Sequence, residues 1–306
     1  MTHDHEEETT RVAPRDVLLA AIEATRPPPS GGAPGRIYTF FGCRGGAGTT
    51  TLAVNTAAAL AQSGPRGVAL LDLDVQLGGV LDALDLSPPA TLVDVLEEID
   101  RLEAAPLRRR LAAHSSGVYV LSQVGNLGQL GAVRPDRVAR LLAVLSCHFD
   151  AVIVDGVRDF GDLALAALDA CARIVMILTA DVAAVRSAAR SVDILRELGY
   201  QDDKIHVVLN RYHRRGAVRP AAISSRLGLA VRATVANDFP VVEHALNHGR
   251  LLSDEAPRAR VSRDVENMVV GLRQSHDAAT VGARLQKPGW RATLSVFSRR
   301  AARARP

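Results

Sequence analysis

The feature that most constrains the fold is a series of short apolar runs, rich in Val, Ile and Leu, spread along most of the chain. The runs lie at 37–41, 68–73, 118–121, 151–154, 174–178, 205–209 and 231–235. They lack the alternation of apolar and polar residues that a half-exposed strand shows. They therefore predict strands that are buried on both faces of a parallel sheet.

Between these runs lie longer segments whose apolar residues recur at helical spacing. The segments are 50–62, 136–145, 183–198 and 240–247. Strands and helices that alternate along a chain predict a doubly wound α/β fold, with a mostly parallel sheet and helices on both faces. The chain has 306 residues, 47% of them hydrophobic and 23% charged, which is enough for one large domain with a substantial core.

A Pro/Gly-rich stretch at 26–35 separates a short segment with helical character, 17–24, from the rest of the chain. We therefore expect three parts: a flexible N-terminal segment and linker at 1–35, a nucleotide-binding domain at 36–286, and a basic tail at 287–306. No apolar run approaches the ~20 residues that cross a bilayer, and the acidic opening lacks the basic start of a signal peptide. These features predict a cytoplasmic protein.

Charge is distributed unevenly along the chain. The net charge is +4, but the last 20 residues carry six basic and no acidic side chains, and the first 35 carry an acidic excess. The body between them is near neutral, which makes a broad nucleic-acid surface less favoured. Cys43, Cys147 and Cys171 are widely spaced and show no metal or disulfide pattern, so we expect reduced thiols.

A glycine-rich loop joins the first predicted strand to the first predicted helix. Small residues let backbone N–H groups converge on phosphate oxygens, and the N-terminus of the following helix favours negative charge. Such a loop can also be only a tight connection, but its place between strand and helix favours phosphate binding. The predicted ligand-binding residues of the loop are Arg44, Gly45, Gly46, Ala47, Gly48, Thr49, Thr50 and Thr51.

This loop resembles that of the ParA/MinD family of deviant Walker ATPases, K-G-G-x-G-K-T-T, and Asn55 matches the helix that follows it. Arg44 stands at the position of the family lysine that reaches the nucleotide of a partner subunit. The resemblance therefore implies a homodimer that binds ATP and Mg²⁺. The resemblance also implies that the Thr50 hydroxyl binds Mg²⁺. Thr49 stands where the second lysine neutralises the β and γ phosphates, so we expect weak hydrolysis or none.

Carboxylates follow two of the predicted strands. The resemblance implies that Asp74 positions the attacking water, with Asp72 as the second candidate for this role. It also implies that Asp155 holds Mg²⁺ through a water molecule. Solvated or helix-capping aspartates are the alternative interpretation. Asn210 and Arg211, after a later strand, resemble a pair that contacts adenine, although Asn is also a common turn residue.

Within the family, the chain is most similar to the CpaE/TadZ branch. The similarity lies in the loss of the P-loop lysine at Thr49, in Arg158 and in the segment 236–240. That resemblance implies a dimeric ATP-dependent switch that localises Flp/Tad pilus or secretion machinery. The alternatives are an active ATPase in DNA partition or division-site placement, and a nucleotide-free structural adaptor. Residues 290–305 form an amphipathic pattern that would attach the protein to the inner face of the membrane or to a cell pole, with a disordered basic end as the equal alternative.

Overall fold

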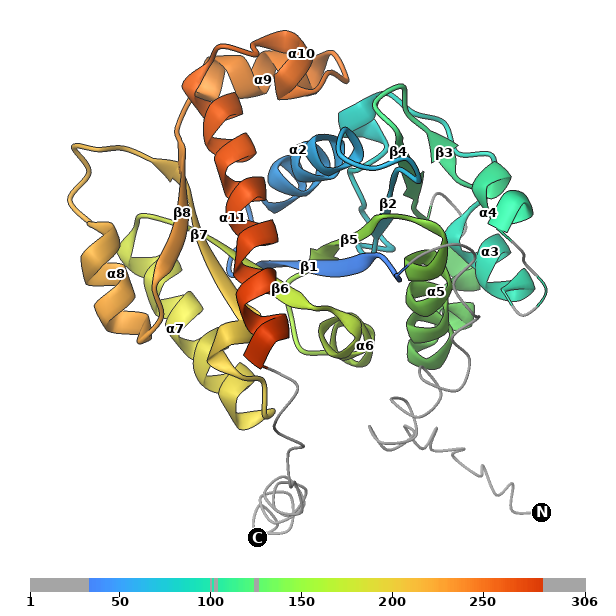
Figure 1. Cartoon of the computed structure of the whole chain (residues 1–306), viewed down its shortest axis with the longest axis horizontal. Coiled ribbons are helices and arrows are strands. Elements are labelled where there is room, and N and C mark those ends of the chain that lie inside the picture. The colour runs from blue at the N-terminus through green and yellow to red at the C-terminus, as the bar shows by residue number, and fades with distance from the viewer. Residues whose placement is uncertain (1–32, 100, 102–103, 124–126, 283–306) are drawn as a thin grey trace, which may run out of the picture.

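The computed structural model describes residues 33–99, 101, 104–123 and 127–282. Eight strands form one sheet in the order β3-β4-β2-β5-β1-β6-β7-β8 (Figure 1). Every neighbouring pair is parallel except β3 and β4. The strands are β1 (Arg36–Gly42), β2 (Val68–Asp72), β3 (Ala112–Ala113), β4 (Val118–Leu121), β5 (Ala151–Val157), β6 (Arg173–Thr179), β7 (Ile205–Tyr212) and β8 (Val231–Ala236).

Helices cover both faces of the sheet. One face carries α3 (Leu92–Glu98), α4 (Ala104–Arg110), α5 (Pro135–His148), α6 (Asp162–Ala170), α7 (Val182–Glu197) and α8 (Pro220–Leu227). The other carries α2 (Thr49–Ala61), α9 (Phe239–Asn247), α10 (Leu252–Glu255) and α11 (Arg260–Gly282). Short 3₁₀ turns lie at η1 (Asp82–Leu84), η2 (Leu127–Ala132) and η3 (Asp202–Lys204).

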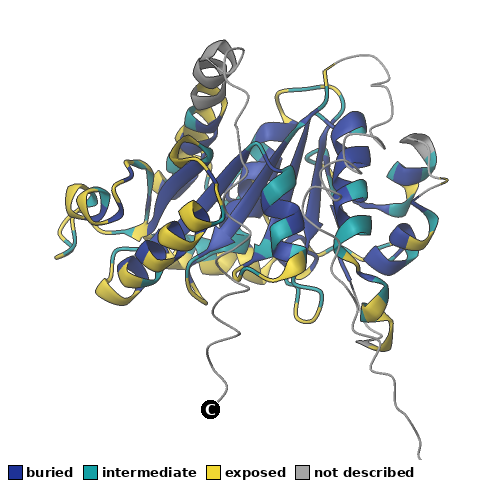
Figure 2. Ribbon diagram, turned by 90° about the horizontal axis from the view of Figure 1, so that it is seen from below, coloured by how far each residue is buried: buried dark blue, intermediate teal, exposed yellow. Residues whose placement is uncertain are grey.

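The central strands bury side chains on both faces, as the unbroken apolar runs predict. On β1, Ile37 and Phe41 join the core beneath α5 and α6, whereas Tyr38 and Phe40 join the core beneath α2 and α11. Figure 2 shows the buried sheet between helices whose outer surfaces are exposed. The doubly wound α/β prediction is confirmed, and the seven predicted strands and the four helices predicted between them are present with ends shifted by a few residues.

Several elements were not predicted: β3, α3, α4, α6, α8, α10 and α11. Helix α11 is the longest of the described helices, with 23 residues, and it packs against β8 and α2 (Figure 1). The predicted segments at 17–24 and 290–305, and most of the predicted N-terminal and C-terminal parts, lie outside the described residues. In the described part, no helix combines the length and hydrophobicity needed to cross a membrane. Cys43, Cys147 and Cys171 form no disulfide bond.

The order of the strands determines where a ligand can bind. Strand β1 lies between β5 and β6, and the chain leaves β1 toward one side of the sheet before it later returns to the other. In open α/β sheets, ligands bind at the carboxyl edge beside such a reversal. The glycine-rich loop follows β1 at this edge, directly before α2.

Candidate functional site

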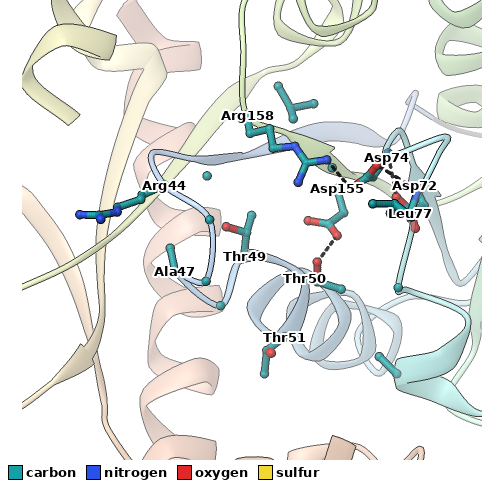
Figure 3. Close-up of a pocket in the computed structure, with 18 of the residues that line it drawn as sticks. Arg44, Ala47, Thr49, Thr50, Thr51, Asp72, Asp74, Leu77, Asp155 and Arg158 are labelled. Atoms are coloured by element: carbon teal, nitrogen blue, oxygen red, sulfur yellow. Dashed lines mark hydrogen bonds and ion pairs between the residues drawn. The ribbon is translucent and has the colours of Figure 1, made fainter. Parts of the chain in front are cut away.

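The loop after β1 folds into an open cradle (Figure 3). Gly46 and Gly48 have φ of 76° and 82°, in the left-handed region that favours glycine. A Cβ on Gly45 or Gly46 would meet no atom within 4 Å, so both face open space. The loop lines a cavity of about 480 Å³. An exposed turn of this kind, directly before a helix N-terminus, can receive a negatively charged group.

Asn210 fixes this loop from the end of β7. Its side-chain amide is buried, and Nδ2 donates a 2.8 Å hydrogen bond to the carbonyl oxygen of Ala47. A Cβ on Gly48 would lie 2.4 Å from the same nitrogen, so the amide packs directly against the loop. Arg211, which follows with φ of 50°, lines the cavity. The structure therefore gives Asn210 a contact with the loop that the sequence did not predict, and the adenine contact of the pair stays a prediction.

Thr50 and Asp155 meet at the floor of the cavity. The Thr50 hydroxyl donates a 2.6 Å hydrogen bond to Asp155 Oδ2, and Asp155 is only 2% exposed. Burial raises the pKa of Asp155, while the bond from Thr50 opposes that rise. Asp155 Oδ1 is buried and has no hydrogen-bond partner among the described residues. A buried, unsatisfied carboxylate oxygen beside a hydroxyl suits a hard cation with oxygen ligands.

No group of three or more His, Cys, Asp or Glu side chains in the described ranges is arranged to hold a metal ion. Mg²⁺ is usually bound by one or two carboxylates together with substrate phosphates, and it keeps several waters. The pair Thr50 and Asp155 fits that pattern, because the remaining ligands would come from phosphate and water.

Asp72 and Asp74 follow β2 beside this floor, but they differ in environment. Asp72 is 1% exposed and accepts hydrogen bonds from the backbone N–H groups of Asp74 at 3.0 Å and Val80 at 3.4 Å. Burial, assisted by the charge of Asp155, raises the pKa of Asp72 to about 6. Asp72 therefore shapes the loop after β2.

The Asp74 side chain is 18% exposed and lies at the cavity wall. Its Oδ2 forms a 2.7 Å ion pair with Nη2 of Arg158. Gly156, with φ of 83°, packs under the same turn, because a Cβ there would lie 2.2 Å from the Asp74 backbone nitrogen. The sequence drew attention to Arg158 only as part of a motif and did not predict its contact with Asp74.

The two residues that depart from the lysine pattern also have defined places. The Arg44 side chain is 57% exposed, and its Nη1 lies 4.0 Å from Asp181 Oδ1, on the opposite side of the loop from Asp155 (Figure 3). The Thr49 hydroxyl lies near the end of β1, 2.8 Å from where a Cβ on Gly42 would be. Neither residue places a cation beside Thr50.

Comparisons with known proteins agree with this geometry. A family model described as the CobQ/CobB/MinD/ParA nucleotide binding domain matches residues 38–250. The septum site-determining protein MinD of Thermotoga maritima is 24% identical over 246 residues, which cover 78% of this chain and 88% of that protein.

Two solved structures share the fold. A ParA family ATPase from Chlorobium tepidum has a TM-score of 0.73 at 20% identity, covering 77% of this chain and 98% of that one. The septum site-determining protein MinD of Pyrococcus horikoshii, solved with Mg-ADP, has a TM-score of 0.66 at 18% identity, covering 82% of this chain and 99% of that one. These likenesses establish the fold.

Proposed function

Since the chain belongs to the family of CobQ/CobB/MinD/ParA nucleotide-binding domains, we propose that it binds Mg²⁺-ATP at the loop after β1 and acts as a nucleotide-dependent switch. The observation that carries the proposal is the 2.6 Å bond from Thr50 to Asp155 beneath an open glycine cradle, with Asp155 Oδ1 buried and unpaired among the described residues. Those are the parts that phosphate and a hydrated metal require.

Each loop residue has a proposed place in binding. The backbone from Gly45 to Thr51 donates N–H groups to the phosphates, and the positive end of α2 adds to their attraction. Thr50 and Asp155 hold the metal, which when bound neutralises phosphate charge. Asn210 keeps the loop in its open form through Ala47, and Arg211 borders the base.

Slow hydrolysis follows from the charges around the cavity. Asp74 is the proposed water-positioning carboxylate, and it lies at the cavity wall. Thr49 supplies no ammonium to the terminal phosphates, and such a cation contributes strongly to phosphoryl transfer. A protein that binds ATP and turns it over slowly holds one conformation for a long time, as a positioning switch requires.

The exposed Arg44 supports a homodimer. Its side chain is 57% exposed and only loosely paired with Asp181, so it is free to reach the nucleotide of a second copy. The finer part of the proposal, localisation of Flp/Tad pilus or secretion machinery at a membrane surface or cell pole, rests on the resemblance of Thr49, Arg158 and 236–240 to the CpaE/TadZ branch.

Calorimetry with ATP and ADP, in the presence of Mg²⁺, tests the proposal, with light scattering on the same samples. We expect tight ATP binding and a doubling of mass that Arg44→Ala abolishes. Arg186→Ala is the matched control, because Arg186 is exposed on α7 and does not line the cavity. Absence of nucleotide binding would leave the structural adaptor as the better interpretation.

A second candidate is an ATPase with rapid turnover in DNA partition or division-site placement. The proximity of Thr50, Asp74 and Asp155 around one cavity favours it. Phosphate release should then be fast and should increase on addition of DNA or of anionic lipid vesicles. A slow rate that neither addition changes would favour the switch.

A further inference from the structure

The lack of a lysine at Thr49 raises the question of which cation meets the terminal phosphate. Three cationic side chains line the cavity, and all belong to the described residues: Arg44, Arg158 and Arg211. Arg44 points away from Asp155, toward Asp181 (Figure 3). Arg211 lies on the Asn210 side of the loop, where its Nε is 4.0 Å from a Cβ built on Gly48. Among the described residues, neither side chain forms a hydrogen bond or ion pair with Thr50 or Asp155.

Arg158 is different, because it follows Asp155 by three residues at the end of β5. Its side chain extends above Asp155 toward Asp74, across the part of the cavity that Thr50 borders (Figure 3). The Arg158 side chain is 59% exposed, and among the described residues its ion-pair partner is Asp74, at 2.7 Å. Because the Arg158 side of the pair is open to water, the guanidinium can exchange Asp74 for another anion.

We propose that Arg158 recognises the terminal phosphate of a nucleoside triphosphate, in the place of the lysine missing at Thr49, and that this exchange releases Asp74 from its ion pair. The inference rests on the proposed nucleotide binding and deepens it. A guanidinium presents a planar fork of donors that matches phosphate oxygens, and a phosphate carries more charge than the Asp74 carboxylate. Asp74 and the phosphate therefore compete for Arg158.

The competition has a consequence for signalling between nucleotide states. A triphosphate draws Arg158 from Asp74, whereas a diphosphate leaves the ion pair in place. Asp74 continues into the turn through Leu77, whose backbone N–H donates to Asp74 Oδ1 at 3.3 Å and whose side chain is 83% exposed. Opening or closing of the Arg158 ion pair is thus transmitted to Leu77, an exposed apolar side chain at the rim of the site.

The test compares ATP with ADP, both with Mg²⁺, by calorimetry on the full chain. We expect Arg158→Gln to weaken ATP binding by about 10- to 100-fold, the range for charge-assisted hydrogen bonds, and ADP binding by less than about threefold. Arg158→Lys should recover part of the ATP affinity. Asp74→Asn should tighten ATP binding, because no ion pair then has to open, and Arg186→Gln should match the wild type.

The outcomes separate this inference from the proposed function. If the wild type binds ATP and Arg158→Gln binds it equally well, the role of Arg158 is wrong and nucleotide binding stands. Equal losses for ATP and ADP would also overturn it, since Arg158 would then only shape the site. If Asp74→Asn weakens ATP binding as much as Arg158→Gln does, the competition is refuted. A wild type that binds neither nucleotide defeats both proposals together.

Discussion

The side-chain amide of Asn210 donates a 2.8 Å hydrogen bond to the backbone carbonyl of Ala47, which precedes it by 163 positions. The bond joins the end of β7 to the loop before α2 and closes the buried side of that loop. The amide also packs against Gly48, which adopts a left-handed conformation with φ of 82°. The hydrogen bond and this packing together fix the position of the loop.

Replacing Asn210 with alanine should loosen this loop. Loss of the bond leaves a buried carbonyl unsatisfied, so we expect the free energy of unfolding to fall by about 1–3 kcal/mol. Nucleotide affinity should fall by about tenfold, because part of the binding free energy then has to order the loop. Urea denaturation and calorimetry measure the two effects. Asn267→Ala, at an exposed position on α11, is the control, and a variant indistinguishable from it would contradict the anchoring role.

Thr50→Ala should uncouple nucleotide binding from Mg²⁺. The hydroxyl contacts Asp155 Oδ2 at 2.6 Å, and without it the metal loses one proposed ligand and Asp155 loses its donor. We expect the gain in ATP affinity on adding Mg²⁺ to shrink by about tenfold, as for loss of a charge-assisted bond. Titrations in Mg²⁺ and in EDTA measure this gain. Thr50→Ser keeps the hydroxyl and should behave as the wild type, and an equal loss in both variants would show that the methyl group matters instead.

The buried Asp72 makes stability depend on pH in a defined direction. Its pKa is raised from 3.8 to about 6 by burial, so the folded state binds a proton more tightly than the unfolded chain does. Its contribution is therefore most favourable below pH 3.8 and declines as the pH rises through about 6. In the absence of Mg²⁺, we expect the wild type to lose about 2 kcal/mol of unfolding free energy relative to Asp72→Asn between pH 4 and pH 7.

Chemical denaturation of both proteins across this pH range gives the difference directly. Defects of the asparagine variant that do not involve ionisation are the same at every pH and cancel in the slope. A difference that stays constant, or that grows in favour of the wild type at high pH, would show that the Asp72 carboxylate ionises without cost in its buried position.

The sequence predicted the fold more completely than it predicted the contacts within the site. Unbroken apolar runs identified the parallel strands because burial on both faces leaves no alternation. Helix α6 was missed since its sequence, DLALAALDA, is almost uniformly apolar and has little helical periodicity. The bond from Asn210 to Ala47 and the ion pair of Arg158 with Asp74 join positions 163 and 84 residues apart, and only the order of strands in the sheet brings them together.

Substitution of Gly156 should disrupt the turn that contains Asp74. Gly156 and Gly199 have nearly equal φ, 83° and 86°, so alanine at either position incurs the left-handed penalty of about 1–2 kcal/mol. At Gly199 a Cβ meets no atom within 4 Å, whereas at Gly156 it would lie 2.2 Å from the Asp74 nitrogen. We expect Gly156→Ala to lower the free energy of unfolding by at least about 3 kcal/mol, because the backbone itself must move. Urea denaturation of the two variants measures the contrast, and equal losses would mean that the turn after β2 yields freely and does not hold Asp74 in place.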